Sequence, residues 1–332
     1  MCSNRLVMSV AILATVATSY AAIPARADQV TGHHDAQPNG RGYEYFAGGS
    51  VTFADGATFD NNSSCGLSLG PQSSVQITGG TFDDNGATAE VAVRGGVVTM
   101  QTVDDSAPVT LDVSGGKFDG NTGAGILGYD IKSTISGGEF DRNSQYGLFA
   151  SNTDGYMEDT MVQYDSGDST VSISGGHFDG NTYCGVYAEE KSTLTITGGT
   201  FDECGQDGLY LDSSTASICG GSFDSNQHYG VFVAAGSTAT ITGSAFRRDG
   251  YAGIYEQNAV VCIRGGTFGA NPIDLYADGG TITLIGSWGP LAGRTLRSGK
   301  GRIVGRLQNA PPGLQTITFG TSEDGEILLR SH

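Results

Sequence analysis

Basic side chains are scarce in this sequence. Its 332 residues include 17 lysines and arginines against 35 aspartates and glutamates, which gives a formal net charge of −18 at pH 7. Nucleic acids and anionic membranes are bound through clusters of basic residues, and the sequence has no such cluster. We therefore expect neither a nucleic acid nor a membrane among the partners of this protein.

Helical periodicity is also missing. The chain contains 53 glycines, and no glycine-free window of about ten residues has apolar residues at the helical spacing of about 3.6. After residue 27, no apolar run is long enough to span a bilayer. These absences exclude a helical bundle and a helical membrane protein.

The cysteines do not form a recognisable disulfide framework. Of the six, Cys2 lies in the expected leader, and the other five occupy unrelated positions. An odd number without regular spacing does not define a set of bridges. Cys184 and Cys204 lie in adjacent repeats and could form a bridge between them.

What the chain does have is a repeat of 22 or 23 residues. A phenylalanine follows a glycine pair, or its equivalent, at nine positions, and two longer gaps of 36 and 38 residues indicate repeats with insertions. The phenylalanines that mark these repeats are Phe59, Phe82, Phe118, Phe140, Phe178, Phe201, Phe223, Phe246 and Phe268. A fixed period in this range predicts a repeat architecture.

Each repeat predicts three short strands. The first alternates apolar and hydroxyl side chains, as in residues 194–197, and alternation is typical of a strand. The glycine pair predicts a tight bend, and the phenylalanine begins a second short strand. An asparagine follows in most repeats, and then a glycine with an aliphatic residue that opens a third strand.

Such strands bury their apolar faces only when the repeats stack, each strand pairing with its copy about 4.8 Å away. The sequence therefore predicts an all-β fold, a right-handed parallel β-helix of about nine to ten coils. We expect columns of phenylalanine and aliphatic residues inside it, and a ladder of asparagine amides at one corner.

The repeat pattern, from about Gly48 to Gly289, resembles the right-handed parallel β-helix repeat family, the pectate-lyase-like superfold. That superfold hosts lyases, hydrolases, adhesins and structural spikes, so the resemblance implies a fold and leaves the function open.

The chain divides into four parts. Residues 1–27 have the charged start, apolar run and small-residue cleavage site of a secretory signal peptide, with cleavage expected near Ala27. We therefore expect a secreted protein, extracellular or periplasmic. Residues 28–48 are expected to form a flexible N-terminal segment or cap, residues 49–289 the β-helix, and residues 290–332 a small C-terminal β cap. Insertions are expected near residues 96–107 and 152–168, both after the third strand.

An aromatic stripe is the main candidate binding site. Alternation sends the second residue of the third strand outward, and in five repeats this residue is aromatic. These candidates are Phe149, Tyr187, Tyr210, Phe232 and Tyr255, joined by Tyr156, Asp159 and Tyr164 of the second insertion. Sugar rings stack on such surfaces, and in proteins that this chain resembles the corresponding face commonly holds a polysaccharide. The alternative is that the rings only stack on one another to stabilise the sheet.

An aspartate directly follows the phenylalanine in seven repeats: Asp60, Asp83, Asp119, Asp141, Asp179, Asp202 and Asp224. Such a row either binds Ca²⁺ or faces water while accepting hydrogen bonds from turn N–H groups, and we favour the second interpretation. We expect no resident metal, and Ca²⁺ is the only cofactor left open.

Catalysis has less support. The sequence lacks the combined Asn-x-Asp, His-Gly and Arg-x-Lys motifs of the pectinases, and no catalytic residue can be assigned. We favour a monomeric, non-catalytic extracellular module that is structural or binds a polysaccharide or another cell-surface component. The alternative is a polysaccharide lyase or glycoside hydrolase.

Overall fold

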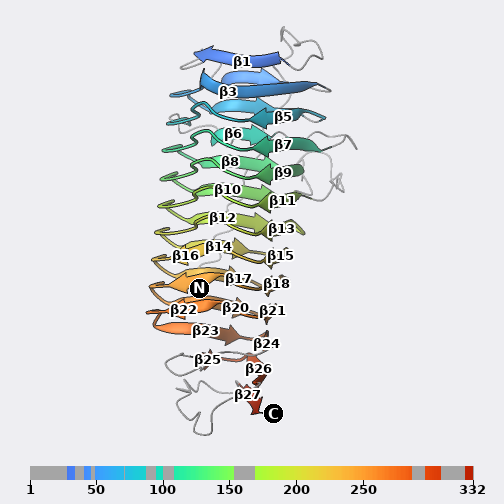
Figure 1. The fold of residues 1–332 in the computed structure, drawn as a ribbon, viewed down its shortest axis with the longest axis vertical. Coiled ribbons are helices and arrows are strands. Elements are labelled where there is room, and N and C mark those ends of the chain that lie inside the picture. Colours follow the sequence, from blue (N-terminus) through green and yellow to red (C-terminus); the bar gives the residue numbers. More distant parts are fainter. Residues whose placement is uncertain are drawn as a thin grey trace, which may run out of the picture.

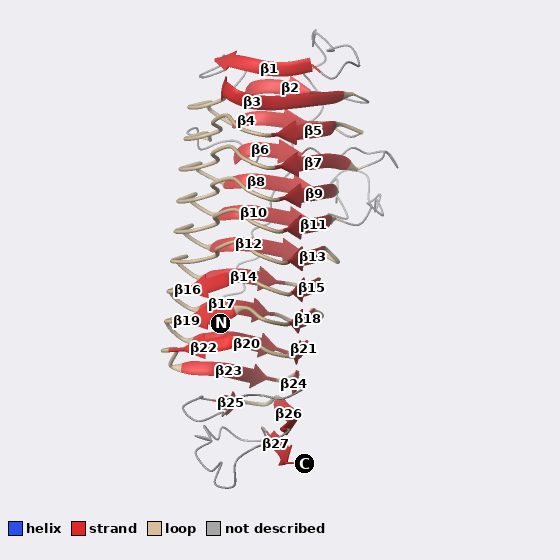
Figure 2. Cartoon of the chain, in the orientation of Figure 1, coloured by secondary structure: helices blue, strands red, loops and turns tan. Residues whose placement is uncertain are grey.

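A computed structural model describes residues 28–33, 41–45, 49–70, 72–86, 95–99, 108–152, 169–285, 296–307 and 326–331. The molecule is a long stack of β-strands, with the N-terminal strands at one end and the C-terminal strands at the other (Figure 1). The described residues contain strands, turns and loops but no helix (Figure 2). Accordingly, they include no helix that is long and apolar enough to cross a membrane.

Two long parallel sheets, A and B, run the length of the stack. Sheet A contains, in spatial order, β1 (Asp28–His33), β3 (Ser50–Thr58), β5 (Ser74–Ile77), β7 (Val109–Val113), β9 (Ile131–Ile135), β11 (Thr170–Ile173), β13 (Thr193–Ile196), β15 (Thr215–Ile218), β18 (Thr238–Ile241), β21 (Val260–Ile263), β24 (Thr281–Leu284), β26 (Arg302–Leu307) and β27 (Glu326–Ser331).

Sheet B contains β2 (Arg41–Tyr45), β4 (Cys65–Leu69), β6 (Gly95–Thr99), β8 (Ala124–Tyr129), β10 (Tyr146–Ser151), β12 (Cys184–Glu189), β14 (Asp207–Leu211), β17 (Tyr229–Val233), β20 (Ala252–Gln257), β23 (Ile273–Asp278) and β25 (Leu296–Ser298). A short third sheet joins β16 (Ser222–Asp224), β19 (Ala245–Arg247) and β22 (Thr267–Gly269), and isolated parallel bridges continue its line upstream from Ser222 to Thr58. The three predicted strands per coil are thus confirmed.

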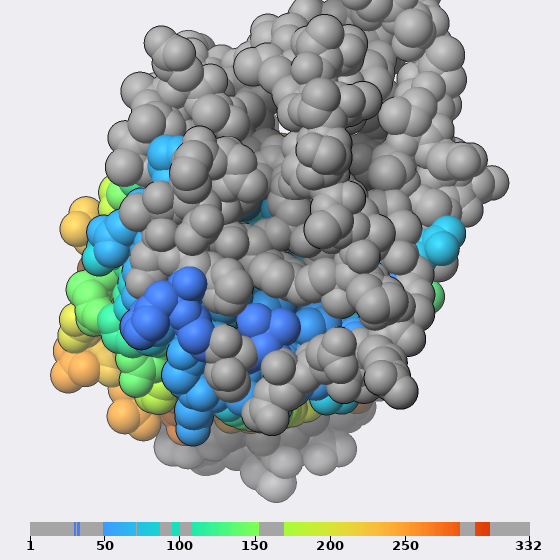
Figure 3. Space-filling model, turned by 90° about the horizontal axis from the view of Figure 1, so that it is seen from above, coloured from blue at the N-terminus to red at the C-terminus, as the bar shows by residue number. Residues whose placement is uncertain are grey.

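Each strand pairs in register with its copy in the next coil. Ile173, Ile196 and Ile218 are successive partners along sheet A, and Val186 and Leu209 are partners on sheet B. Viewed from the N-terminal end, residues of successive coils, coloured from blue to orange, lie one behind another along one side of the molecule (Figure 3). The parallel β-helix predicted from the repeat is therefore confirmed.

The nine phenylalanines form one interior column. Neighbouring ring centroids are 4.6–5.2 Å apart and the ring planes lie within 21° of each other. The rings of Phe201 and Phe223, for example, are 4.9 Å apart at an angle of 11°, and both are fully buried. The glycine pair before each ring is needed for close approach: a Cβ on Gly198 would lie 2.5 Å from the carbonyl oxygen of Ser174, and Gly199 has a φ of +98°.

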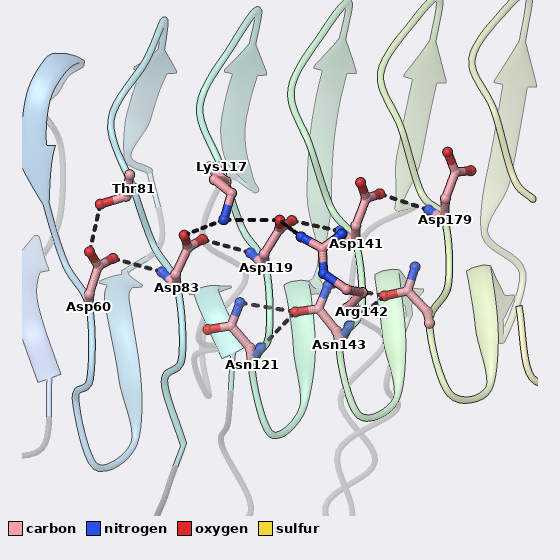
Figure 4. Close-up of polar contacts among 11 residues, drawn as sticks. Asp60, Thr81, Asp83, Lys117, Asp119, Asn121, Asp141, Arg142, Asn143 and Asp179 are labelled. Atoms are coloured by element: carbon pink, nitrogen blue, oxygen red, sulfur yellow. Dashed lines mark hydrogen bonds and ion pairs between the residues drawn. The ribbon is translucent and has the colours of Figure 1, made fainter. Parts of the chain in front are cut away.

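The predicted asparagine ladder lies at the corner beyond this column (Figure 4). Each side-chain amide donates to the Oδ1 atom of the asparagine in the next coil, at 3.0–3.1 Å, along Asn62, Asn85, Asn121, Asn143 and Asn181. All five side chains are buried, so the ladder satisfies polar groups that would otherwise be costly inside the corner.

Strands extend both ends of the β-helix. From the segment 28–48, which we expected to form a flexible segment or cap, β1 and β2 pair with β3 and β4 as a further coil. Beyond Gly289, β25 joins sheet B while β26 and β27 extend sheet A, so the described strands of the expected cap continue the helix. A strand at the end of the stack pairs with only one other strand. It can form this pairing without carrying the repeat sequence.

The first insertion is also placed differently. Residues Gly95–Thr99, which we expected at its start, form β6 in register with β4. Cys65 follows Phe59 by six residues, whereas its partner Gly95 follows Phe82 by thirteen, so seven extra residues precede β6 and the remainder follow it. The second insertion lies between β10 and β11, and its ends meet where the Ser169 N–H donates to Oδ1 of Asn152 at 2.5 Å.

Cys184 and Cys204 do not form the bridge considered from the sequence, and both thiols are free and buried. Cys184 lies on sheet B, whereas Cys204 occupies an asparagine position of the corner ladder, where its N–H donates to Oδ1 of Asn226.

Asp249 replaces an asparagine in the ladder and produces a testable pH dependence. Its Oδ1 atom accepts from the side-chain amide of Asn226 at 3.1 Å, and Oδ2 has no hydrogen-bond partner in the described part of the chain. Burial raises the pKa of this carboxyl group to about 8. The folded state therefore favours the protonated form, and the stability from this group is lost as pH rises from about 4 to about 8.

We predict that Asp249→Asn stabilises the protein at pH 8 by about 1–3 kcal/mol, because an amide fills the ladder position without a buried charge. The gain should be much smaller at pH 4, where the native carboxyl group is protonated. Urea unfolding of both proteins at the two pH values measures the difference, and an equal effect at both would contradict the assignment.

Candidate functional site

The outer surface of sheet B carries an almost continuous set of aromatic rings, which we call the aromatic face. Its central row follows the inward-pointing aliphatic residues of six successive strands, as Tyr187 follows the fully buried Val186 on β12. The central row consists of Phe149, Tyr187, Tyr210, Phe232, Tyr255 and Tyr276, and the flanking rings are Tyr146, Tyr183, Tyr229 and Tyr251.

The five predicted stripe residues do come together. From Phe149 to Tyr276, neighbouring centroids in the central row are 4.6–5.5 Å apart, and the ring planes are tilted by 49–73° from one ring to the next. Tilted and edge-on contacts at this distance are favourable for aromatic pairs. This packing of the rings on one another is what the alternative interpretation expects.

The stripe is less exposed than a row of outward-pointing rings would suggest. Phe149 and Tyr255 are each only 8 % exposed, while Tyr187, Tyr210 and Phe232 are partly exposed. The reason is the flanking rings. Tyr146 stacks on Tyr187 at 5.2 Å and Tyr229 stacks on Tyr255 at 4.6 Å.

The flanking rings were not predicted, because strict alternation sends Tyr146 and Tyr229 inward, to the same side as Leu148 and Val231. The glycine between each pair breaks the alternation: Tyr146 pairs with Cys184 and Leu148 with Val186, but the intervening glycines do not pair. Tyr183 and Tyr251 extend the face and are its most accessible rings, 40 % and 41 % exposed. The sequence signal for these flanking rings is a tyrosine close before the glycine that opens the third strand.

Carboxylates border the aromatic face. Glu189 and Asp278 follow central-row tyrosines by two residues, and Asp212 directly follows β14 in the same position. The Tyr255 hydroxyl donates to Oδ2 of Asp278 at 3.0 Å, and the side chain of Tyr187 is hydrogen-bonded to Glu189. Burial, and secondly the Glu189 carboxylate, raise the pKa of the Tyr187 hydroxyl, which therefore remains a hydrogen-bond donor at neutral pH.

One carboxyl group lies within the face itself. Asp207 pairs with Cys184 across sheet B and is 3 % exposed, and its Oδ1 atom accepts from the backbone N–H of Tyr229 at 3.1 Å. Burial raises its pKa to about 8, so the side chain is mostly uncharged at pH 7. It therefore adds little negative charge to the surface.

The three candidates from the second insertion, Tyr156, Asp159 and Tyr164, lie outside the described residues.

The aspartates of the row bind backbone N–H groups of the neighbouring coil (Figure 4). From Asp60 to Asp202, Oδ1 of each aspartate accepts the backbone N–H of the aspartate in the next coil at 2.8–2.9 Å, and Asp224 ends the series. Cations relieve part of the remaining charge: Lys117 lies 2.8 Å from Asp83 and 3.1 Å from Asp119, and Arg142 lies 2.6 Å from Asp119. The favoured interpretation, aspartates bonded to turn N–H groups, matches this geometry.

The row is poorly suited to a metal ion. Calcium takes six to eight oxygen ligands, whereas here one oxygen of each carboxylate is already occupied by a backbone N–H. Among the described residues, no group of three or more His, Cys, Asp or Glu side chains has a geometry that could hold a metal ion.

Comparison with known proteins supports the fold. Residues 113–268 match the family model described as the right handed beta helix region. The match agrees with the parallel stack of coils and shows a right-handed β-helix region within the chain. No curated protein matches the chain.

We predict that millimolar Ca²⁺ leaves the melting temperature of the protein unchanged, because the carboxylates are committed to backbone and cationic partners. Differential scanning calorimetry with Ca²⁺ and with a chelator tests this directly. A rise of several degrees with Ca²⁺ would show a site that the described residues do not contain.

Proposed function

We propose that this protein is an exported, non-catalytic β-helix module that binds a polysaccharide on its aromatic face. The observation that carries the proposal is the central row: six rings on six successive strands, with centroids 4.6–5.5 Å apart. Amphipathic rings in this number on one outer face are uncommon unless the face contacts a ligand or partner. A sugar chain lying along the helix axis would meet one ring per coil.

The partly exposed rings define where contact would be made. Tyr183 and Tyr251 stand furthest into solvent, and Tyr187 and Tyr210 lie between them in the central row. Tyrosine offers a ring to stack on and a hydroxyl to hydrogen-bond, and it loses little conformational entropy when bound. Because the strands hold the rings in place, the surface is organised before the ligand arrives.

A lyase is less well supported than binding. Lyases of the resembled superfold use a basic residue beside carboxylate-bound Ca²⁺. Among the described residues, Arg297 has its guanidinium 4.9 Å from the Tyr276 ring at the C-terminal end of the aromatic face, and the His228 ring lies 6.1 Å from the Tyr229 ring. The metal-binding carboxylates of such a lyase have no counterpart among the described residues.

Glycoside hydrolysis is the second candidate function, and one observation favours it. Ala188 pairs with Leu211, so the next residues, Glu189 and Asp212, lie on adjacent strands beside Tyr187 and Tyr210. Strands are about 4.8 Å apart, which is close to the carboxylate separation of about 5–5.5 Å in retaining glycosidases. Burial, opposed by hydrogen bonds and reinforced by Asp212, raises the pKa of Glu189, as a general acid requires.

We predict that Tyr187→Ala combined with Tyr210→Ala weakens polysaccharide binding by about 30-fold or more, the loss that corresponds to about 2 kcal/mol for a contact residue. Titration calorimetry against a panel of soluble polysaccharides measures it. Thr195→Ala, on the exposed outer surface of sheet A, is the matched control and should bind normally.

Because Tyr187 and Tyr210 also pack within the sheet surface, a second variant keeps the test decisive. Tyr183→Ala with Tyr251→Ala removes rings that are largely exposed and should preserve the melting temperature while weakening binding. Unchanged affinity in both double variants would overturn the aromatic face as the site. Release of new reducing ends by the native protein would establish hydrolysis in place of simple binding.

A further inference from the structure

Three carboxylates along one border of the aromatic face bear on the chemistry of its ligand. Glu189 and Asp212 lie on neighbouring coils, and Asp278 lies on the same edge three coils beyond Asp212. All three side chains are partly exposed, on the same side of the central row. A ligand lying on the rings would therefore pass two carboxylates on neighbouring coils and a third carboxylate three coils further on, with Ala234 and Gln257 at the equivalent positions between them.

These carboxylates accept hydrogen bonds from uncharged groups, and the described residues give them no ion pair. Asp278 accepts from the Tyr255 hydroxyl at 3.0 Å, and that hydroxyl lies 3.4 Å from the Nε2 atom of Gln257. Asp212 accepts from the Ser213 hydroxyl at 3.1 Å. None of the three acidic side chains forms an ion pair with any residue in the described ranges.

The contrast with the aspartate row is informative. In that row, carboxylates stacked one per coil are offset by Lys117, Arg142 and Arg248, each 2.6–2.8 Å from an aspartate oxygen. The chain thus supplies cations where stacked carboxylates serve the fold. Beside the aromatic face, none of Glu189, Asp212 and Asp278 is ion-paired within the described residues, although burial and the neighbouring Asp212 raise the pKa of Glu189.

We infer that the ligand of the aromatic face is a cationic glycan, a chain of hexosamine units with free amino groups. Its sugar rings would lie on the central row, and its ammonium groups would lie beside Glu189, Asp212 and Asp278. This inference rests on the proposed function and names the chemical class of its ligand.

Charge decides between the glycan classes. An ammonium group beside a partly buried carboxylate gains a charge-assisted hydrogen bond. A uronic-acid chain would instead bring a carboxylate on each sugar to a surface that already carries unpaired carboxylates, within a protein of net charge −18. A neutral chain would stack on the rings but gain nothing from the acidic border.

Three soluble hexamers test the inference: glucosamine, N-acetylglucosamine and galacturonic acid. Titration calorimetry should show the glucosamine hexamer binding about ten-fold or more tightly than the N-acetyl hexamer, the effect of two or three partly exposed ion pairs. Its affinity should fall as salt is raised, since these pairs are screened. The galacturonic acid hexamer should not bind.

A charge-neutralising variant locates the effect. Glu189→Gln with Asp212→Asn should reduce the affinity for the glucosamine hexamer toward that for the N-acetyl hexamer, and Asp278 should retain the remaining difference. Asp112→Asn is the matched control, because it neutralises an exposed carboxylate on the outer surface of sheet A. Melting curves confirm that the variants are folded.

The outcomes separate this inference from the proposed function. Equal binding of the amino and N-acetyl hexamers, preferred binding of the galacturonic acid hexamer, or no effect of the double variant would overturn the cationic ligand. Loss of the observed binding in the tyrosine variants would still support the aromatic face as a polysaccharide site. If the protein binds no hexamer and no polysaccharide of the panel, both fail.

Discussion

In-register pairing of each coil with the next is the constraint on which this structure depends. Once Ile173, Ile196 and Ile218 are partners on one sheet and Val186 and Leu209 on another, every position of the repeat becomes a column along the molecule. A column stacks like on like at a spacing of about 4.8 Å. The chemistry of each side chain then decides whether its column is favourable.

Rings and amides form favourable columns, whereas charges do not. The phenylalanine column fills the interior with parallel rings, and the asparagine ladder satisfies its own amides at the corner. The aspartate row is tolerated because each carboxylate accepts an N–H from the next coil and because Lys117 and Arg142 lie against Asp119. The carboxylates beside the aromatic face accept hydrogen bonds from hydroxyl groups, and Asp278 also accepts the Lys300 N–H, but none is ion-paired within the described residues. For that reason we propose that a cationic ligand pairs with them.

The repeat made much of this architecture predictable. Regular spacing of phenylalanine, asparagine and glycine predicted the coil, the three strands, the interior column and the ladder, because those features recur within one period. The exposure of the rings was not predictable, since Tyr146 and Tyr229 lie before a glycine at which strict alternation fails. The position of β6 was not predictable either, because the 36-residue gap fixes the length of an insertion but not how it divides around a strand.

The same reasoning explains the two ends of the β-helix. Residues 28–48 and 290–332 lack the repeat sequence, yet β1, β2, β25, β26 and β27 continue the two sheets. Backbone hydrogen bonds to a preceding coil need no particular side chain, so an end coil diverges in sequence without leaving the fold. The sequence repeat therefore identifies the coils whose side chains stack in columns. It does not identify the end coils, which lack the repeated residues.

Disulfide trapping on the outer surface of sheet A measures the register most directly. Ser172 and Thr195 are partners on adjacent strands, whereas Ser172 and Ser217 are two coils apart. Strands about 4.8 Å apart fall within the Cα separation of a disulfide, and a distance of about 10 Å does not. In a background with Cys219→Ser and Cys262→Ser, the account predicts that Ser172→Cys with Thr195→Cys oxidises to an intramolecular bridge and that Ser172→Cys with Ser217→Cys does not. Efficient bridging of the second pair in place of the first would contradict the in-register stack.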